Sequence, residues 1–204
     1  MATRVAVLAS GGGTNFENLA HRAGDIGIEI AVLVTDSADA FAINRAEQLG
    51  IPYVVHPRGE HPSKSAHESA IIETLRTYDI SYVLLAGYMR ILSAGFIESF
   101  ERSIINVHPS LLPSYGGKGY YDLVVHRAVL EAGESETGCT VHFCDNEYDH
   151  GPIIVQQAVP VLDDDTPDTL AARVFEAECE AFPEAIRRFA TGRLTVDGNR
   201  AVLK

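Results

Sequence analysis

The sequence predicts an α/β fold: a doubly wound, mainly parallel sheet flanked by helices, with a late antiparallel hairpin. Through the first half of the chain, short runs rich in β-branched residues alternate with helical patterns, which is typical of parallel βαβ units. After Pro109 comes an irregular loop rich in proline and glycine, and then two strand-like runs separated by a polar loop. The length of 204 residues favours one domain that covers residues 1–204.

The elements of the first half follow from hydrophobic periodicity. Between residues 63 and 78, apolar residues recur at helical spacing, namely Ala66, Ala70, Ile71 and Leu75. Continuous apolar runs predict strands at residues 4–9, 28–35, 53–56, 81–86 and 103–107. Helices are expected near residues 14–23, 40–49, 63–78 and 94–100.

The second half shows a different pattern. Helices are expected near residues 123–132 and 166–191, and strands at 139–144, 153–159, 193–196 and 200–202. Pro183 is expected to kink the long second helix. The polar loop 145–151 joins the first two of these strands, and the Asp197-Gly198 turn predicts a hairpin of the last two.

Composition excludes several classes of protein. The net charge of −12 disfavours non-specific binding to nucleic acid or to anionic membranes. No apolar run approaches the ~20 residues of a membrane-spanning helix, and the N-terminal run is too short for a signal peptide. We therefore expect a cytoplasmic protein without nucleic-acid or membrane partners; a monomer or a homodimer is expected. Cys139, Cys144 and Cys179 show no metal-ligand spacing, so reduced thiols are expected, with a catalytic thiol as the alternative.

The segment Ser10-Gly11-Gly12-Gly13-Thr14-Asn15 lies where the first strand leads into the first helix. Glycines let the backbone approach a ligand, and a helix N-terminus offers N–H donors to an anion, so the segment predicts a phosphate site. It is not a Walker loop, because no Gly-Lys-Ser/Thr follows, and Phe16 replaces the third glycine of a dinucleotide fingerprint. Asp36, about 20 residues on, keeps a ribose-binding role open. The alternative is a tight turn with Thr14 as N-cap.

Asn106 and His108 lie at the carboxyl end of the fifth predicted strand, two residues apart and therefore on one face. Open α/β sheets bind ligands at this edge, and an amide and an imidazolium can together stabilise an oxyanion. Asp149, in the polar loop, would favour the protonated imidazole if it lay beside His108, and could accept a proton. The alternatives are a capped strand end and a solvated acidic loop.

The other polar groups are assigned no chemistry. Asp163-Asp164-Asp165 is expected only to precede the helix that starts near Thr166. No set of histidines and carboxylates shows the spacing of a metal site, so no metal is expected. His142 lies within a predicted strand and is interpreted as a hydrogen-bonded core group. Surface or loop positions are expected for His21, His56, His61, His67 and His126.

Taken together, these segments resemble the phosphoribosylglycinamide formyltransferase family, folate-dependent enzymes of purine synthesis, over almost the whole chain. The resemblance is carried, in the family's order, by residues 10–15, 85–92, 105–113, 138–143 and 149–154, with Glu178 and Phe182-Pro183. The His-Pro-Ser-Leu-Leu-Pro run at 108–113 is shared by the wider formyltransferase superfamily. The glycine-rich turn and the chain length indicate this member.

The resemblance implies a formyltransferase-like fold and transfer of the formyl group of N10-formyltetrahydrofolate, the cosubstrate, to the amine of glycinamide ribonucleotide, without a metal. Asn106, His108 and Asp149 match the family's catalytic residues: the first two would stabilise the tetrahedral oxyanion, and the third would assist proton transfer. The ribonucleotide and its phosphate would be bound by Gly13, Thr14, Asn15, Pro109 and Glu178. The folate would be bound by Met89, Arg90, Ile91, Leu92, Asn106, Asp145 and Asp149.

The chain departs from the family's pattern in two loops. Residues 114–121 are longer than the shortest family versions, and Lys118 within them could reach an anionic group. His150 stands where some relatives carry glycine. Two alternatives remain: a formyltetrahydrofolate hydrolase, and a nicotinamide-dependent oxidoreductase on a Rossmann-like sheet, although the chain shows no second mononucleotide-binding half.

Overall fold

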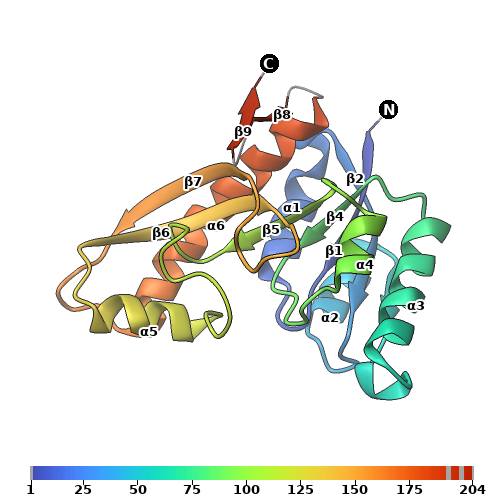
Figure 1. Cartoon of the computed structure of the whole chain (residues 1–204), viewed down its shortest axis with the longest axis horizontal. Helices are drawn as coiled ribbons and strands as arrows, with labels where there is room; N and C mark the ends of the chain where they lie inside the picture. Colours follow the sequence, from blue (N-terminus) through green and yellow to red (C-terminus); the bar gives the residue numbers. More distant parts are fainter. Residues whose placement is uncertain (1, 192–193, 198–199, 204) are drawn as a thin grey trace. The chain divides into compact units, whose positions relative to one another are not determined.

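The computed structural model describes residues 2–191, 194–197 and 200–203, and the chain divides into two compact units, Met1–Ile105 and Asn106–Lys204 (Figure 1). The expected single domain over residues 1–204 stays a prediction. In the described ranges, no helix combines the length and the hydropathy that a bilayer crossing requires.

The first unit alternates strands and helices. Its elements are β1 (Thr3–Leu8), α1 (Thr14–Ile26), β2 (Ile28–Thr35), α2 (Ala42–Leu49), β3 (Tyr53–Val55), η1 (Arg58–Glu60), α3 (Lys64–Thr77), β4 (Tyr82–Leu85) and α4 (Ala94–Ser99), and β5 (Ile104–His108) begins at its end. The strands lie in the order β3-β2-β1-β4, and the β1–β2, β1–β4 and β2–β3 pairs are parallel. Residues 5–8 of β1 are fully buried, which is typical of a parallel strand covered on both faces.

The strands and helices predicted for this half are confirmed with small shifts of their ends, and β2 has the predicted bounds. The alternative in which Thr14 is the N-cap is wrong on that point. Gly13 caps α1 in the left-handed conformation, with φ of 71°, and Thr14 is the first helical residue. The short 3₁₀ helix η1 was not predicted, because a single turn leaves no periodic pattern in the sequence.

The second unit contains α5 (Leu123–Glu131), β6 (Glu136–Phe143), β7 (Ile153–Pro160), α6 (Pro167–Ala190), β8 (Leu194–Asp197) and β9 (Arg200–Leu203). Its strands follow the order β5-β6-β7-β9-β8, with β6–β7 and β8–β9 antiparallel. Helix α6 packs along β6 and β7 (Figure 1). Its buried stripe includes Leu170, Val174, Ala177 and Ala181, at the spacing that one helical face requires.

The predicted mainly parallel sheet with a late antiparallel hairpin is confirmed, and the terminal β8–β9 hairpin is present, although the predicted Gly198 of its turn lies outside the described residues. Strand β6 begins at Glu136, earlier than predicted. The prediction began after Gly138 because glycine is uncommon inside strands. A Cβ at Gly138 would clash with the backbone of Gln157 on β7, so the glycine permits this close pairing. Pro183 lies inside α6, on its buried side.

Two histidines expected at the surface are buried instead. His67 on α3 is 2% exposed and its Nε2 lies 2.8 Å from the carbonyl oxygen of His56, while His126 on α5 is 4% exposed. Each lies on the buried face of its helix, beside apolar residues such as Ile71 on α3 and Val129 on α5. Burial lowers the pKa of His126.

Candidate active site

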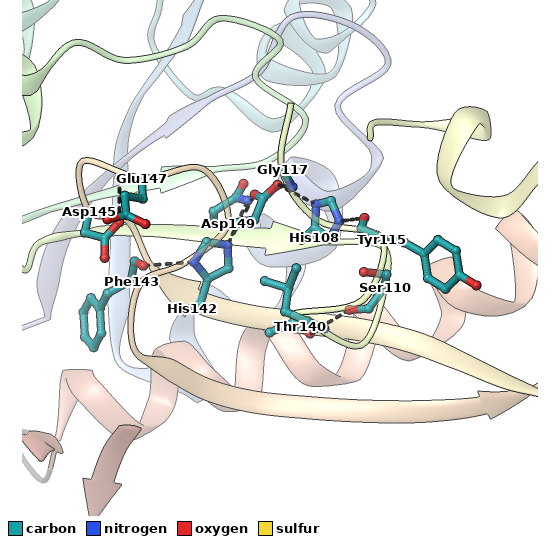
Figure 2. Close-up of polar contacts among 12 residues, drawn as sticks. His108, Ser110, Tyr115, Gly117, Thr140, His142, Phe143, Asp145, Glu147 and Asp149 are labelled. Atoms are coloured by element: carbon teal, nitrogen blue, oxygen red, sulfur yellow. Dashed lines mark hydrogen bonds and ion pairs between the residues drawn. The ribbon is translucent and has the colours of Figure 1, made fainter. Parts of the chain in front are cut away.

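The second unit brings the predicted catalytic residues together. Asn106 and His108 end β5, and Asp149 lies in the loop between β6 and β7. The Nδ1 atom of His108 is 3.7 Å from the Oδ2 atom of Asp149 (Figure 2). His108 is almost fully buried, and the Asp149 side chain is 18% exposed. The imidazole and the carboxylate therefore face each other at a place that a small ligand could reach from solvent.

The protonation of His108 is constrained from its other side. Its Nε2 atom lies 2.8 Å from the carbonyl oxygen of Tyr115, and because a carbonyl only accepts, Nε2 carries a proton. The Nδ1 atom of the same ring faces the Asp149 carboxylate. The imidazole of His108 is therefore buried and oriented between the Tyr115 carbonyl and Asp149.

His142 on β6 completes the cluster, and the sequence reasoning assigned it no functional role. Its Nδ1–H donates to the carbonyl of Phe143 at 2.9 Å, so in the neutral ring Nε2 is an acceptor. Nδ2 of Asn106 lies 3.2 Å from that Nε2 atom and donates to it. Burial lowers the pKa of His142, against the opposing effects of the Phe143 carbonyl and Asp149. Neutral His142 therefore orients the Asn106 amide and leaves its second N–H for another acceptor.

Asp149 is held in a conformation that its loop enforces. Its φ of 50° lies in the left-handed region, which is uncommon for a residue with a side chain. Its Oδ2 atom accepts the backbone N–H of Gly117 at 2.8 Å. A Cβ at Gly151 would clash with the carbonyl of Phe143, so this loop packs directly against β6. Backbone contacts on both sides thus fix the carboxylate opposite His108.

The carbonyl that binds His108 belongs to a loop braced by β6 and β7. Thr140 Oγ1 donates to the Ser110 carbonyl at 2.6 Å and accepts the N–H of Leu112 at 2.9 Å. Gln156 Nε2 donates to the Leu112 carbonyl at 2.9 Å. The Leu112–Pro113 peptide bond is cis. The loop that carries Tyr115 is therefore part of the rigid frame of the unit; Lys118, farther along it, is exposed.

The glycine-rich segment in the first unit forms a tight strand-to-helix turn. A Cβ on Gly13 would lie 2.6 Å from the Cβ of Ala42, and the N–H of Ala42 donates to the Gly11 carbonyl at 3.0 Å. Arg45 Nε donates to the Gly12 carbonyl at 2.9 Å, and its guanidinium also pairs with Glu17. The turn is pinned by α2, and it ends at the N-terminus of α1, an arrangement suited to an anion.

The predicted folate segment, residues 89–92, follows β4 in the first unit. Met89 and Ile91 are exposed, at 53% and 51%. Arg90 Nε donates to Asp36 Oδ2 at 2.5 Å, so Asp36, considered as a ribose ligand, is already engaged by an arginine. This pairing argues against the nicotinamide alternative.

The remaining predicted residues lie in the second unit. Glu178 is buried on α6, and Pro109 directly follows β5. Asp145 begins the polar loop and pairs with His150 Nδ1 at 2.8 Å, a contact that raises the pKa of His150. Asp165 of the acidic cluster pairs with Arg173 at 2.5 Å.

The structure also bears on thiol and metal chemistry. Burial raises the pKa of the Cys139 thiol to about 12, and it also raises the pKa of Cys144. A thiolate is the nucleophilic form, so neither cysteine is poised for catalysis at neutral pH. Within the described ranges, no group of three or more His, Cys, Asp or Glu residues could hold a metal ion.

Comparison with known proteins places this geometry in context. The family model described as "Formyl transferase" matches residues 3–186. The chain is 38% identical over 202 residues to phosphoribosylglycinamide formyltransferase of Haemophilus influenzae, covering 98% of this chain and 93% of that protein. It is 40% identical to the chloroplastic phosphoribosylglycinamide formyltransferase of Vigna unguiculata, but spans only 62% of its length. The solved structure of glycinamide ribonucleotide transformylase 1 from Symbiobacterium toebii superposes with a TM-score of 0.94 at 40% identity, over 99% of this chain and 94% of that one.

Proposed function

The chain belongs to the formyl transferase family, and we propose that it transfers the formyl group of N10-formyltetrahydrofolate to the amine of glycinamide ribonucleotide in purine biosynthesis. The observation that carries this proposal is the cluster in the second unit. There the carboxylate of Asp149 lies near the imidazoles of His108 and His142, and His142 contacts the amide of Asn106. The relatives named above, of which two match this chain over nearly their full length, support the choice of substrates.

The chemistry requires a charge to be stabilised and a proton to be moved. The unprotonated amine attacks the formyl carbon, and the carbonyl oxygen becomes a tetrahedral oxyanion. The imidazolium of His108 and the second N–H of Asn106 stabilise this oxygen; one such donor is worth about 10²–10³ in rate. Asp149 receives a proton from the attacking nitrogen and supports its delivery to the leaving N10 atom. No covalent enzyme intermediate forms, which agrees with the suppressed thiolates.

The acceptor is proposed to bind through its phosphate to Gly13, Thr14 and Asn15. The support is the geometry of the turn: a left-handed glycine that packs against Ala42, followed by the N-terminus of α1 with its N–H donors. Pro109 and Glu178 are proposed to contact the ribonucleotide, by their match to the family's positions.

The folate is proposed to bind Met89, Arg90, Ile91 and Leu92, mainly through their backbone groups, together with Asn106, Asp145 and Asp149. No metal is required in this scheme. The protein is proposed to be cytoplasmic, a monomer or homodimer, acting on small molecules without nucleic acid or membrane partners.

A steady-state assay with purified protein tests this function. Formyl-folate is supplied with glycinamide ribonucleotide, or with water as the only acceptor. Formation of formylated ribonucleotide that saturates in both substrates is the expected result. Release of formate at the same rate without ribonucleotide would contradict the proposal and favour a hydrolase.

A further inference from the structure

The segment that follows β4, residues 87–93, is clamped by side chains from three other parts of the first unit. Ser10 follows β1, Asp36 follows β2 and Glu68 lies on α3. The carboxyl ends of β1, β2 and β4 belong to neighbouring parallel strands, so Ser10 and Asp36 approach the segment from one edge of the sheet, while Glu68 reaches it from α3.

Each clamp holds a different point of the segment. Ser10 Oγ accepts the N–H of Met89 at 2.9 Å, and the Ser10 N–H donates to the Gly87 carbonyl at 3.0 Å. Asp36 Oδ2 accepts from Arg90 Nε at 2.5 Å. The carboxylate of Glu68 accepts from the backbone N–H of Ser93, at 2.8 Å, and from its hydroxyl. The segment is thereby held through its backbone at Met89 and Ser93 and through the side chain of Arg90 between them.

Of these three side chains, Asp36 is the one whose burial costs the most free energy of folding. Its side chain is only 3% exposed, and within the described parts of the chain its buried Oδ1 atom has no hydrogen-bond partner. Burial, and then the charge of Asp36, raise the pKa of the adjacent Tyr88. A buried carboxylate with one unsatisfied oxygen is a poor way to stabilise a fold, because its desolvation is only partly offset.

A second buried aspartate shows what a stabilising arrangement looks like. The side chain of Asp165 is 2% exposed, yet its two oxygens accept from both terminal nitrogens of Arg173, from the N–H of Leu162 and from the hydroxyl of Thr169. Among the described residues, Asp36 contacts a single arginine, and that arginine lies in the segment proposed to bind folate. The difference indicates that Asp36 is there to place Arg90.

We infer that Asp36 is a positioning residue for the folate: by holding the Arg90 side chain it sets the backbone of residues 90–92, with Ser10 and Glu68 holding the flanks. The inference rests on the proposed function, because it assumes that this segment contacts formyl-folate. Asp36 itself does not touch the reacting atoms. Its loss should therefore weaken folate binding without slowing the chemical step.

The test is the isosteric Asp36→Asn variant, which removes the charge and keeps the shape. KM for formyl-folate should rise about tenfold, equivalent to about 1.4 kcal/mol, while kcat and KM for the ribonucleotide stay within about twofold of wild type. Ser10→Ala, which removes an acceptor but no charge, should shift the same constant in the same direction. Amide hydrogen exchange at Met89 and Ser93 should be faster in both variants without any ligand.

Asp165→Asn is the matched control, since it removes an equally buried aspartate charge from an arginine pair elsewhere. It should lower the unfolding temperature and leave both KM values unchanged. If wild-type protein forms formylated product but Asp36→Asn keeps a wild-type folate KM and tetrahydrofolate Kd, the positioning role is wrong. If wild-type protein forms no such product, the proposed function itself fails, and the exchange data then report only on the clamp.

Discussion

Replacing His142 by phenylalanine removes the acceptor that orients the Asn106 amide. Nδ2 of Asn106 lies 3.2 Å from Nε2 of His142, whose Nδ1–H donates to the Phe143 carbonyl at 2.9 Å. A phenyl ring fills the same buried space and offers neither bond. The His142→Phe variant therefore tests orientation rather than packing.

The expected magnitudes follow from these two contacts. Each hydrogen bond contributes about 0.5–1.5 kcal/mol net, so the free energy of unfolding should fall by about 1–3 kcal/mol. An oxyanion donor is worth about 10²–10³ in rate, and because the Asn106 amide is misoriented rather than deleted, we expect kcat to fall about 10–100-fold. KM for the ribonucleotide should change little, since the oxyanion contact forms only in the transition state, whereas KM for the folate should rise because Asn106 is also proposed to contact it.

Initial rates with both substrates, together with thermal unfolding, measure these effects separately. His142→Gln is the matched control, because its amide oxygen can stand in for Nε2 as a neutral acceptor. Its kcat should stay within about tenfold of wild type. A folded His142→Phe variant with wild-type kcat, or a glutamine variant as slow as the phenylalanine variant, would refute the orienting role.

Three further predictions address other parts of the molecule. Asn15→Ala should raise KM for the ribonucleotide at least about tenfold more than KM for the folate in steady-state kinetics, and equal effects would undercut the phosphate assignment. Gly138→Ala should destabilise the fold by more than about 2 kcal/mol in denaturant unfolding, because its Cβ would meet the backbone of Gln157; unchanged stability would contradict the close β6–β7 pairing. The hydrogen bond to Asp145 raises the pKa of His150. The pair therefore stabilises the folded protein fully below the unfolded pKa of histidine, near 6.5, and this stabilisation is lost as the pH rises through the higher pKa of the folded state. His150→Ala should therefore lower the unfolding temperature at pH 5.5, roughly one unit below the unfolded pKa, and not at pH 9, more than about two units above it. An equal loss at both pH values would exclude the ion pair as the cause.

Much of the fold could be predicted from the sequence, because buried parallel strands leave continuous apolar runs. Strand β2 was predicted with its observed bounds for this reason. The start of β6 was missed, since Gly138 is a breaker by propensity and its role depends on the Gln157 backbone across the strand pair. Thr14 was considered as the N-cap of α1 in the alternative reading, but close packing of Gly13 against Ala42, not side-chain capping, sets that turn.

The site was predicted less completely. Asn106 and His108 could be placed on one face of one strand, and the resemblance to a known family supplied Asp149 as their partner. His142 lies on the same face of β6 as Thr140, two residues away. Only the structure shows that this face of β6 meets Asn106. Asp36 was considered as a ribose ligand by its distance along the chain, whereas its real partner, Arg90, lies far away in sequence and could not be inferred from spacing.

The central claim is that buried His108, held against Asp149, stabilises the charge that develops during formyl transfer. The direct test combines single-turnover rates of the His108→Ala variant with its affinity for tetrahydrofolate. We predict a rate lower by at least about 10²-fold, with the folate Kd within about tenfold of wild type. A folded variant that transfers the formyl group at the wild-type rate would contradict the claim.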